Sequence, residues 1–321
     1  MRQTCLEMVH QLAKADERIF FIGSDLGVGT LDGFKSEMPG RFFMEGISEA
    51  NIIGLAAGFA MEGKIPYVNT IATFLTRRCF EQIVVDLCLH NVNVRLIGNG
   101  GGLVYAPLGP THEAIEDIAI LRAIPNMTIV SPADADEMRR LMPLTVDHPG
   151  PVYIRVARGF DPIVTNDEGG FEIGKAISMA QGTDALIVTT GITLKIALEA
   201  ADALAETGVS AAVLHCHTVK PLDTEAILDY AGPVKAIVTI EEHTVIGGLG
   251  SAVAENARHS SGEGRRTRTE EVCKTYQDYR EEERVIGYRV SYHFQDETHT
   301  MRLDEDPGDT VRLKLAISAA D

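Results

Sequence analysis

Residues 43–60 read FMEGISEANIIGLAAGFA, and this stretch does most to decide the fold. Its first residues suit a strand, and from Glu49 onward apolar and small residues recur at helical spacing. Gly54, Ala57 and Gly58 leave room for another backbone or helix to approach closely. The stretch therefore predicts a strand-like approach, a turn and a helix over about 49–62, a unit typical of α/β proteins.

The same alternation continues on both sides of this stretch. Short apolar runs rich in β-branched residues alternate with helical patterns, as in a parallel sheet covered by helices on both faces. The expected strands are 19–22, 67–68, 94–97, 127–130 and 152–155. The expected helices cover about 3–14, 49–62, 75–90, 112–123 and 133–146. Together these elements predict one α/β domain over residues 1–160.

A linker and a second α/β domain are expected next. Residues 159–174 contain Pro162 and an Asn-Asp-Glu-Gly-Gly cluster, a composition typical of linkers. The second domain is expected over 175–260, with strands at 185–190, 211–214 and 236–240. Its helices are expected at 194–207 and 224–231, and a glycine-rich turn at 246–250 opens a third that ends near 258. The predicted fold class is α/β, two doubly wound domains with largely parallel sheets.

The last part of the chain has a different character. Residues 286–294 and 298–303 show alternating strand patterns, and Asp306-Pro307-Gly308-Asp309 suits a turn. This pattern is typical of antiparallel hairpins. We therefore expect a small β-rich tail over residues 265–321, and an apparently truncated second domain before it.

Composition excludes several classes of function. The chain of 321 residues is 45 % hydrophobic and 23 % charged, and it has no apolar run long enough to cross a membrane. Its first residues lack the pattern of a signal peptide, so a cytoplasmic location is expected. A net charge of −17 argues against binding to nucleic acid or to an anionic membrane. The five cysteines lack CxxC spacing, so we expect reduced thiols and no metal site.

Glu49 is the most informative residue about function. An acid in the first turn of a helix is favoured by the helix dipole, which alone would explain it. It is accompanied, however, by three further segments in a fixed order. These are TIATFLTRRCFEQI at 70–83, GPTHEAIED at 109–117 and HTVKPLD at 217–223.

In this order and spacing, the four segments resemble the transketolase family over roughly residues 1–260. The resemblance matches the pyrimidine-binding and C-terminal domains, the part found as the C-terminal subunit of split transketolases. It implies a thiamine-diphosphate enzyme that transfers a two-carbon ketol unit from a ketose to an aldehyde, in carbohydrate metabolism. Glu49 would then bond a ring nitrogen of the aminopyrimidine, so that the ring can remove the thiazolium proton. A buried carboxyl beside an aromatic ring suits that sharing of a proton.

The resemblance also assigns roles to other residues. Phe74 falls where the family stacks an aromatic ring on the aminopyrimidine, although an aromatic in an apolar run is often a core residue. Ile71 stands where an aromatic is common, and it is expected to contact the pyrimidine. Arg77 is expected beside the cofactor. Asp25 matches an acid near the cofactor, and it is equally well explained as a turn residue.

Two residues are expected at the substrate. His112 matches a catalytic residue that reaches the cofactor's amino group and the reacting carbonyl, and the alternative is a solvated histidine at a helix start. Arg158 matches an arginine that grips a sugar phosphate, since a guanidinium offers paired donors. Its alternative is a surface ion pair.

Besides Ile71, three differences from the family pattern concern contacts to the substrate. Gly29 stands where sugar-phosphate transketolases carry a serine, and Leu108 replaces an acid that contacts the donor. The stretch 100–105, GGGLVY, lacks the histidine that usually precedes the GPTH segment. Because three substrate contacts differ while Glu49 remains, the cofactor is better supported than any particular sugar phosphate.

The other half of the site is expected from a partner. The sequence has no Gly-Asp-Gly motif followed by Asn, the family's signature for magnesium and diphosphate. The resemblance therefore implies a separate diphosphate-binding N-terminal subunit that holds Mg²⁺. Two copies of each subunit are expected to form a heterotetramer, which includes self-association of this chain.

Two alternatives to a transketolase subunit stay open at this point. The β subunit of a 2-oxo-acid dehydrogenase shares the glutamate and the two-domain plan. A non-catalytic or chimeric protein is suggested by residues 265–315, which weakly resemble the C-terminal β module of glycine-zipper outer-membrane lipoproteins. That tail would be a fusion, a joined or shifted reading frame, or a divergent end of the same domain.

Overall fold

The structure is a computed structural model that describes residues 1–24, 29–157, 159, 161–166, 170–260, 288–294 and 297–303. The side chains of residues 257–260, and nearly all of those in the last two ranges, lie outside this description. The chain divides into two units, Met1–Arg265 and Arg266–Asp321.

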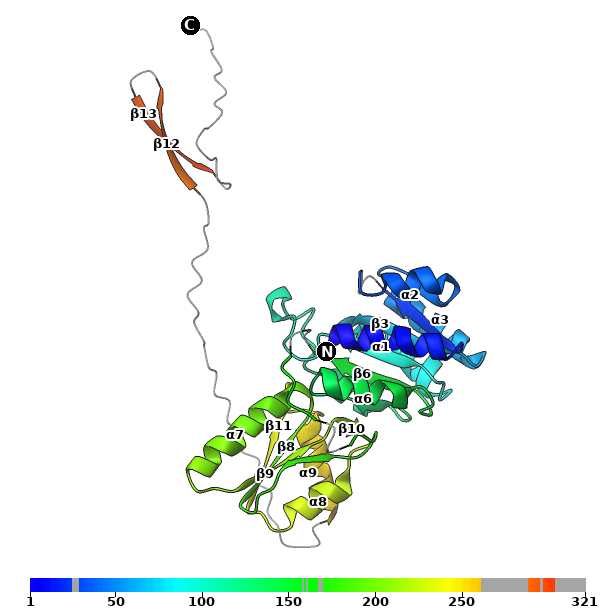
Figure 1. The fold of residues 1–321 in the computed structure, drawn as a ribbon, viewed down its shortest axis with the longest axis vertical. Coiled ribbons are helices and arrows are strands. Elements are labelled where there is room, and N and C mark those ends of the chain that lie inside the picture. Colours follow the sequence, from blue (N-terminus) through cyan, green and yellow to red (C-terminus); the bar gives the residue numbers. More distant parts are fainter. Residues whose placement is uncertain are drawn as a thin grey trace. The chain divides into compact units, whose positions relative to one another are not determined.

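Within the described residues, seven strands form the first sheet, in the order β10-β5-β6-β4-β3-β1-β2. Neighbours pair in parallel except β10 and β5, which are antiparallel. Strands β3, β6 and β10 of this sheet are labelled in Figure 1. The strands are β1 (Ile19–Gly23), β2 (Phe42–Met44), β3 (Ile65–Ile71), β4 (Arg95–Asn99), β5 (Thr128–Val130), β6 (Val152–Val156) and β10 (Thr218–Lys220). Every residue of β4 and β6 is buried, as expected for strands covered on both faces.

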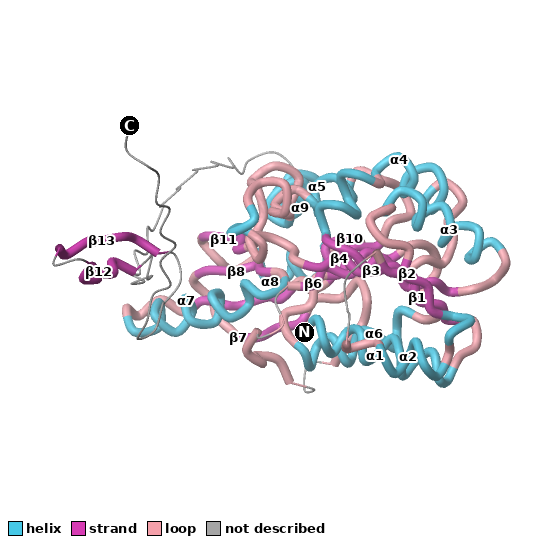
Figure 2. The backbone as a smooth tube through the Cα atoms, turned by 90° about the horizontal axis from the view of Figure 1, so that it is seen from above, coloured by secondary structure: helices cyan, strands magenta, loops and turns pink. Residues whose placement is uncertain are grey.

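Helices cover both faces of this sheet, as Figure 2 shows. One face carries α1 (Arg2–Ala15), α2 (Asp32–Glu37) and α6 (Ala135–Thr145), with Leu6, Phe34 and Leu141 in its core. The other face carries α3 (Glu49–Met61), α4 (Phe80–Gln82), α5 (Asp117–Arg122) and two π-helical segments, η2 (Phe74–Arg78) and η3 (Ile83–Cys88). Short 3₁₀ turns are η1 (Pro39–Arg41) and η4 (Ala106–Leu108).

The second sheet has the order β11-β8-β9-β7 among the residues described. Its strands are β7 (Ile177–Ala180), β8 (Ala185–Thr189), β9 (Ala211–His215) and β11 (Ala236–Ile240); β7 runs antiparallel to β9, and the other pairs are parallel. The 3₁₀ turn η6 (Gly191–Thr193) leads into α7 (Leu194–Glu206), which covers one face. The other face is covered by α8 (Thr224–Ala231) and α9 (Leu249–Ser260). The expected α/β class with largely parallel sheets is therefore confirmed.

Two expected helices differ in the structure. The helix expected over 112–123 begins only at Asp117, because Ala114 exchanges backbone hydrogen bonds with Gly102 and holds the preceding residues in a loop. The helix expected over 75–90 is present as η2, α4 and η3, with π-helical turns on both sides of a short α-helix. Such wide turns are frequent at functional sites.

Strand β10 was not expected from the sequence. It follows the second sheet's β9 along the chain but pairs with β5 of the first sheet. The Lys220 ammonium donates to the carbonyl oxygens of Arg122, at 3.0 Å, and Ile124. The part of the unit Met1–Arg265 that carries the second sheet is therefore hydrogen-bonded directly to the first sheet.

The unit Arg266–Asp321 contains the strands β12 (Tyr288–Phe294) and β13 (Glu297–Leu303). They pair antiparallel, with Tyr288 opposite Leu303 and Phe294 opposite Glu297. This is the hairpin expected from the alternating patterns, shifted by two residues or fewer at each end. Among the described residues, no helix is both long and apolar enough to cross a membrane.

Candidate active site

The loops that follow β1, β3 and β4 meet at one edge of the first sheet, because parallel strands place their carboxyl ends together. Hydrogen bonds between strand ends fix this edge. Ser24 Oγ lies 2.9 Å from Thr70 Oγ1, and Asn99 Nδ2 donates to Asn69 Oδ1 at 2.7 Å. The segments singled out from the sequence at 43–51, 70–83 and 109–117 all reach this edge.

Glu49 is the first residue of α3, and its side chain is only 2 % exposed. The turn before it is set by Gly46, whose φ of 67° favours glycine. The Gly46 N–H donates to the carbonyl oxygen of Ser24 at 3.0 Å, which attaches the turn to the end of β1. Arg78 Nη1 donates to Glu49 Oε2. The sequence therefore places a carboxylate in a nearly dry position at the sheet edge.

Phe74 links Arg78, the partner of the Glu49 carboxylate, to the ring of His112. The Phe74 and His112 rings meet edge to face, with centroids 5.1 Å apart. The Arg78 guanidinium lies 4.5 Å from the Phe74 ring centroid. His112 is oriented by Thr111, whose Oγ1 lies 2.8 Å from His112 Nδ1. Glu49, Phe74 and His112, which come from three separate segments, are thus linked through Arg78 and direct ring contact.

Arg77 points to the loop that carries His112. Its guanidinium donates to the carbonyl oxygens of Pro110 and Glu113, each at 2.8 Å, and it pairs with Glu116. The pKa of Arg77 is raised, chiefly by the hydrogen bond to Glu116. These bonds hold the 109–116 loop against η2.

The remaining expected residues are placed as follows. Ile71 is the last residue of β3 and is partly buried, next to Thr70 and close to the start of the η2 segment. Asp25 and Arg158 lie outside the described residues, so their expected contacts stay predictions.

A buried ionic network under the 109–116 loop was not expected from the sequence. Asp117 accepts from Tyr153 Oη at 2.7 Å and from Arg155 Nε at 2.8 Å, and it is fully buried. Arg155 also donates to the carbonyl oxygens of Ala114 and Glu242. Burial raises the pKa of Tyr153. The sequence feature that could have revealed this network is the Tyr-x-Arg pair in the otherwise apolar strand β6. An arginine buried in such a strand needs a partner for its charge.

A second buried cluster lies between the two sheets. His215 Nε2 lies 3.0 Å from Glu137 Oε2, and both side chains are fully buried. His217 stacks on Phe171 with ring centroids 3.9 Å apart. Burial lowers the pKa of His217 to about 4. Burial is the largest single influence on Glu137 and raises its pKa, but the neighbouring His215 and His217 and the hydrogen bonds from His215 and the Ala133 N–H together lower it.

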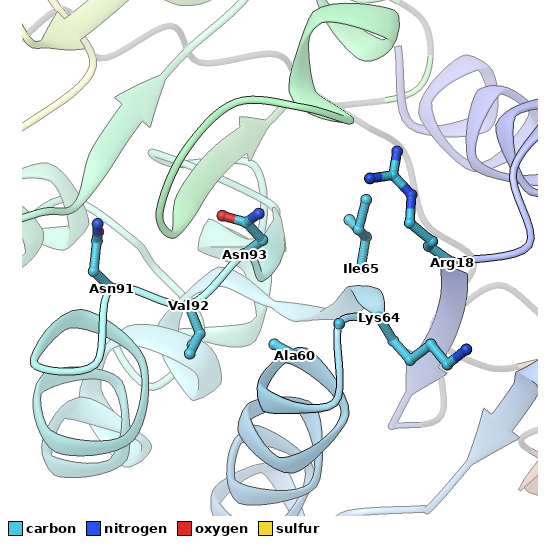
Figure 3. Close-up of a pocket in the computed structure, with 8 residues that line it drawn as sticks. Arg18, Ala60, Lys64, Ile65, Asn91, Val92 and Asn93 are labelled. Atoms are coloured by element: carbon cyan, nitrogen blue, oxygen red, sulfur yellow. The ribbon is translucent and has the colours of Figure 1, made fainter.

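The cavity in Figure 3 has a volume of about 240 Å³ and is lined by Arg18, Lys64, Ile65, Asn91 and Asn93, among others. Ile65 begins β3, and Asn93 lies just before β4. The cavity therefore lies at the amino ends of the strands, opposite the edge that carries Glu49. Among the described residues, no group of His, Cys, Asp and Glu is arranged to hold a metal ion.

Comparison with known families agrees with this fold. Residues 1–160 match the model of the transketolase pyrimidine-binding domain, and residues 174–279 match that of the transketolase C-terminal domain. The chain belongs to the transketolase family.

Its relatives include subunits of divided enzymes. The chain is 40 % identical over 256 residues to the 6-deoxy-6-sulfo-D-fructose transketolase subunit SqwH of a Clostridium species, covering 79 % of this chain and 80 % of that one. It is 41 % identical over 256 residues to an apulose-4-phosphate transketolase subunit of Phocaeicola vulgatus, covering 79 % and 82 %.

A solved structure shows the same architecture. A split-gene transketolase, described as an inactive β4 tetramer, superposes with a TM-score of 0.76 at 38 % identity, over 81 % of this chain and 84 % of that one. These relatives favour a transketolase subunit over a 2-oxo-acid dehydrogenase subunit and over a non-catalytic protein.

Proposed function

We propose that the chain is the pyrimidine-binding subunit of a thiamine-diphosphate-dependent transketolase, active only with a diphosphate-binding partner subunit. The observation that carries the proposal is the buried Glu49 carboxylate, linked to the Phe74 ring through Arg78 at the carboxyl edge of the sheet. The family matches and the split-subunit relatives support it.

The residues fit the pyrimidine half of the cofactor. A carboxyl that is 2 % exposed can exchange a proton with a ring nitrogen without competition from bulk water. Phe74 offers a ring for stacking, and Ile71 offers an aliphatic contact at the end of β3. When bound, thiamine diphosphate supplies an acidic thiazolium carbon that can carry a two-carbon unit.

His112 is proposed to act on the substrate. Its ring is held by Thr111 and Phe74, and its side chain is partly exposed in a loop fixed by Arg77. A positioned imidazole can hold or deliver a proton at the reacting oxygen. Arg158 is proposed to bind an anionic group of the ketose or the aldehyde.

The diphosphate and Mg²⁺ are proposed to rest on the partner subunit. The sequence lacks the Gly-Asp-Gly motif, and the described residues present no carboxylate cluster for a metal. Two copies of each subunit would form the heterotetramer, with self-association of this chain.

Co-expression with a diphosphate-binding subunit tests the proposal. The purified pair is titrated calorimetrically with thiamine diphosphate and Mg²⁺, and each subunit is titrated alone as a control. We expect tight binding by the pair, much weaker binding by either subunit, and ketol transfer from a ketose to an aldehyde by the pair. A stable pair that binds no cofactor would rule the proposal out.

A further inference from the structure

Arg78 occupies a position to which the sequence motifs assigned no role. It is the last residue of η2, four positions after Phe74, so the two side chains lie on the same side of the helix. Its guanidinium lies over the Phe74 ring at 4.5 Å, and Nη1 donates to Glu49 Oε2. Arg78 therefore contacts both side chains that are proposed to hold the aminopyrimidine.

The contacts of Arg78 imitate those proposed for the cofactor ring. A guanidinium is planar, it stacks on aromatic rings, and it presents N–H donors in its plane to a carboxylate. An aminopyrimidine is also planar, stacks in the same manner and exchanges hydrogen bonds with a carboxyl group. Because a stacked ring and a stacked guanidinium cannot share one face of Phe74 and one carboxylate oxygen, they compete.

We propose that Arg78 is a placeholder that closes the pyrimidine site of this chain and must leave Glu49 and Phe74 before the cofactor ring can bind. The inference rests on the proposed function and adds a control element to the same site. The Arg78 side chain can move away from Glu49 into solvent, because it is 45 % exposed whereas that of Glu49 is 2 % exposed. A long, flexible side chain can move its charge into water while its carbon stem stays in place.

The placeholder has a thermodynamic consequence. A ligand that binds only when Arg78 is withdrawn has its apparent affinity reduced by the fraction of chains in that state. Removal of the guanidinium should therefore tighten cofactor binding. A hydrogen bond to a charged group corresponds to about a tenfold change in a binding constant, which sets the expected size of the effect.

Calorimetric titration of the assembled pair with thiamine diphosphate and Mg²⁺ tests this directly. Arg78→Ala is compared with the wild type and with Arg139→Ala, which removes an exposed arginine paired with Asp136 on α6. We expect Kd about tenfold lower for Arg78→Ala and unchanged for Arg139→Ala. An unchanged or higher Kd for Arg78→Ala would overturn the placeholder, since Arg78 would then be neutral or part of the bound site.

A second measurement follows the wild-type pair itself, and a variant that keeps the positive charge is needed only to assign one signal. The Arg78 Nε–Hε resonance is assigned by its loss in Arg78→Lys and followed by NMR during the titration. We expect the signal to move toward that of a solvated guanidinium as cofactor binds, and a signal that stays unchanged at saturation would overturn the proposal. If neither the wild type nor Arg78→Ala binds cofactor, the proposed function itself fails.

Discussion

At the scale of single residues, the candidate site combines side chains whose surroundings differ from what their place in the sequence suggests. Glu49 begins a helix, where an acid is common, but it is buried and faces a cation at the sheet edge. Phe74 belongs to an apolar run, but its ring contacts His112 and Arg78. The sequence indicated these residues through their motifs. It did not indicate Arg78, because nothing in one sequence says which of two adjacent arginines points inward.

Replacement of Phe74 should weaken cofactor binding. Phe74→Leu keeps an apolar side chain but removes the aromatic face, so we expect a Kd for thiamine diphosphate about three- to tenfold higher in the assembled pair. Phe59→Leu is the matched control, since Phe59 packs on Phe20 and Phe43 away from the site. Equal effects of the two changes would argue against a stacking role.

Replacement of His112 should affect turnover more than cofactor binding. For His112→Gln we expect kcat of the pair to fall by about a hundredfold with the cofactor Kd little changed, because the lost group is the one proposed to hold or deliver a proton at the substrate. His90→Gln, at an exposed position, serves as control. Full activity of His112→Gln would remove His112 from the proposed mechanism.

At the scale of elements, the 109–116 loop is held in place by hydrogen bonds from two arginines, Arg155 and Arg77. Arg155 bonds the carbonyl oxygen of Ala114 while its charge is neutralised by Asp117, and Arg77 bonds two further carbonyl oxygens of the loop. The loop replaces the first part of the helix that the pattern of residues 112–123 suggested. Periodicity could not reveal this, because the loop is set by the pairing of Ala114 with Gly102, a contact between residues well apart in the sequence.

Breaking the buried pair should destabilise the fold. Asp117→Asn leaves Arg155 buried without its counter-charge, so we expect a loss of about 3 kcal/mol in the free energy of unfolding, measured by urea titration. Asp136→Asn, which breaks the exposed pair with Arg139, should cost less than about 1 kcal/mol. Similar losses for both would contradict a supporting role for the Asp117 network.

At the scale of the whole chain, the two sheets of the unit Met1–Arg265 are joined by β10 and by the Glu137, His215 and His217 cluster. The sequence predicted the α/β class and most of the elements, since apolar runs and helical spacing are local signals, but it did not predict α2 or β7. It did not predict that the HTVKPLD segment would add a strand to the first sheet, because local periodicity does not determine which strands pair. The hairpin at 288–303 was predicted from alternation, which is local.

The buried cluster should make stability depend on pH. His217 has a pKa lowered from 6.5 to about 4, so the unfolded chain binds more protons between these values and stability falls as the pH is lowered through that window. The lowered pKa of Glu137 acts in the same direction below its ordinary value of 4.5. From pH 7 to pH 5 we expect His217 to account for a loss of roughly 2 kcal/mol.

Urea titrations at pH 7 and pH 5 check this expectation. His217→Gln removes the titrating ring, so its stability should fall less between the two pH values than that of the wild type, whereas His90→Gln should follow the wild type. A His217→Gln variant with the full pH dependence would show that other groups are responsible.

The central claim is that Glu49 activates the aminopyrimidine, and exchange of the thiazolium C2 proton for deuterium in the assembled pair measures it most directly. Glu49→Gln keeps the size of the side chain but cannot take part in the proton transfer. We predict that the exchange rate falls at least about a hundredfold while the cofactor stays bound. A Glu49→Gln pair that binds cofactor and exchanges the proton at the wild-type rate would contradict the account.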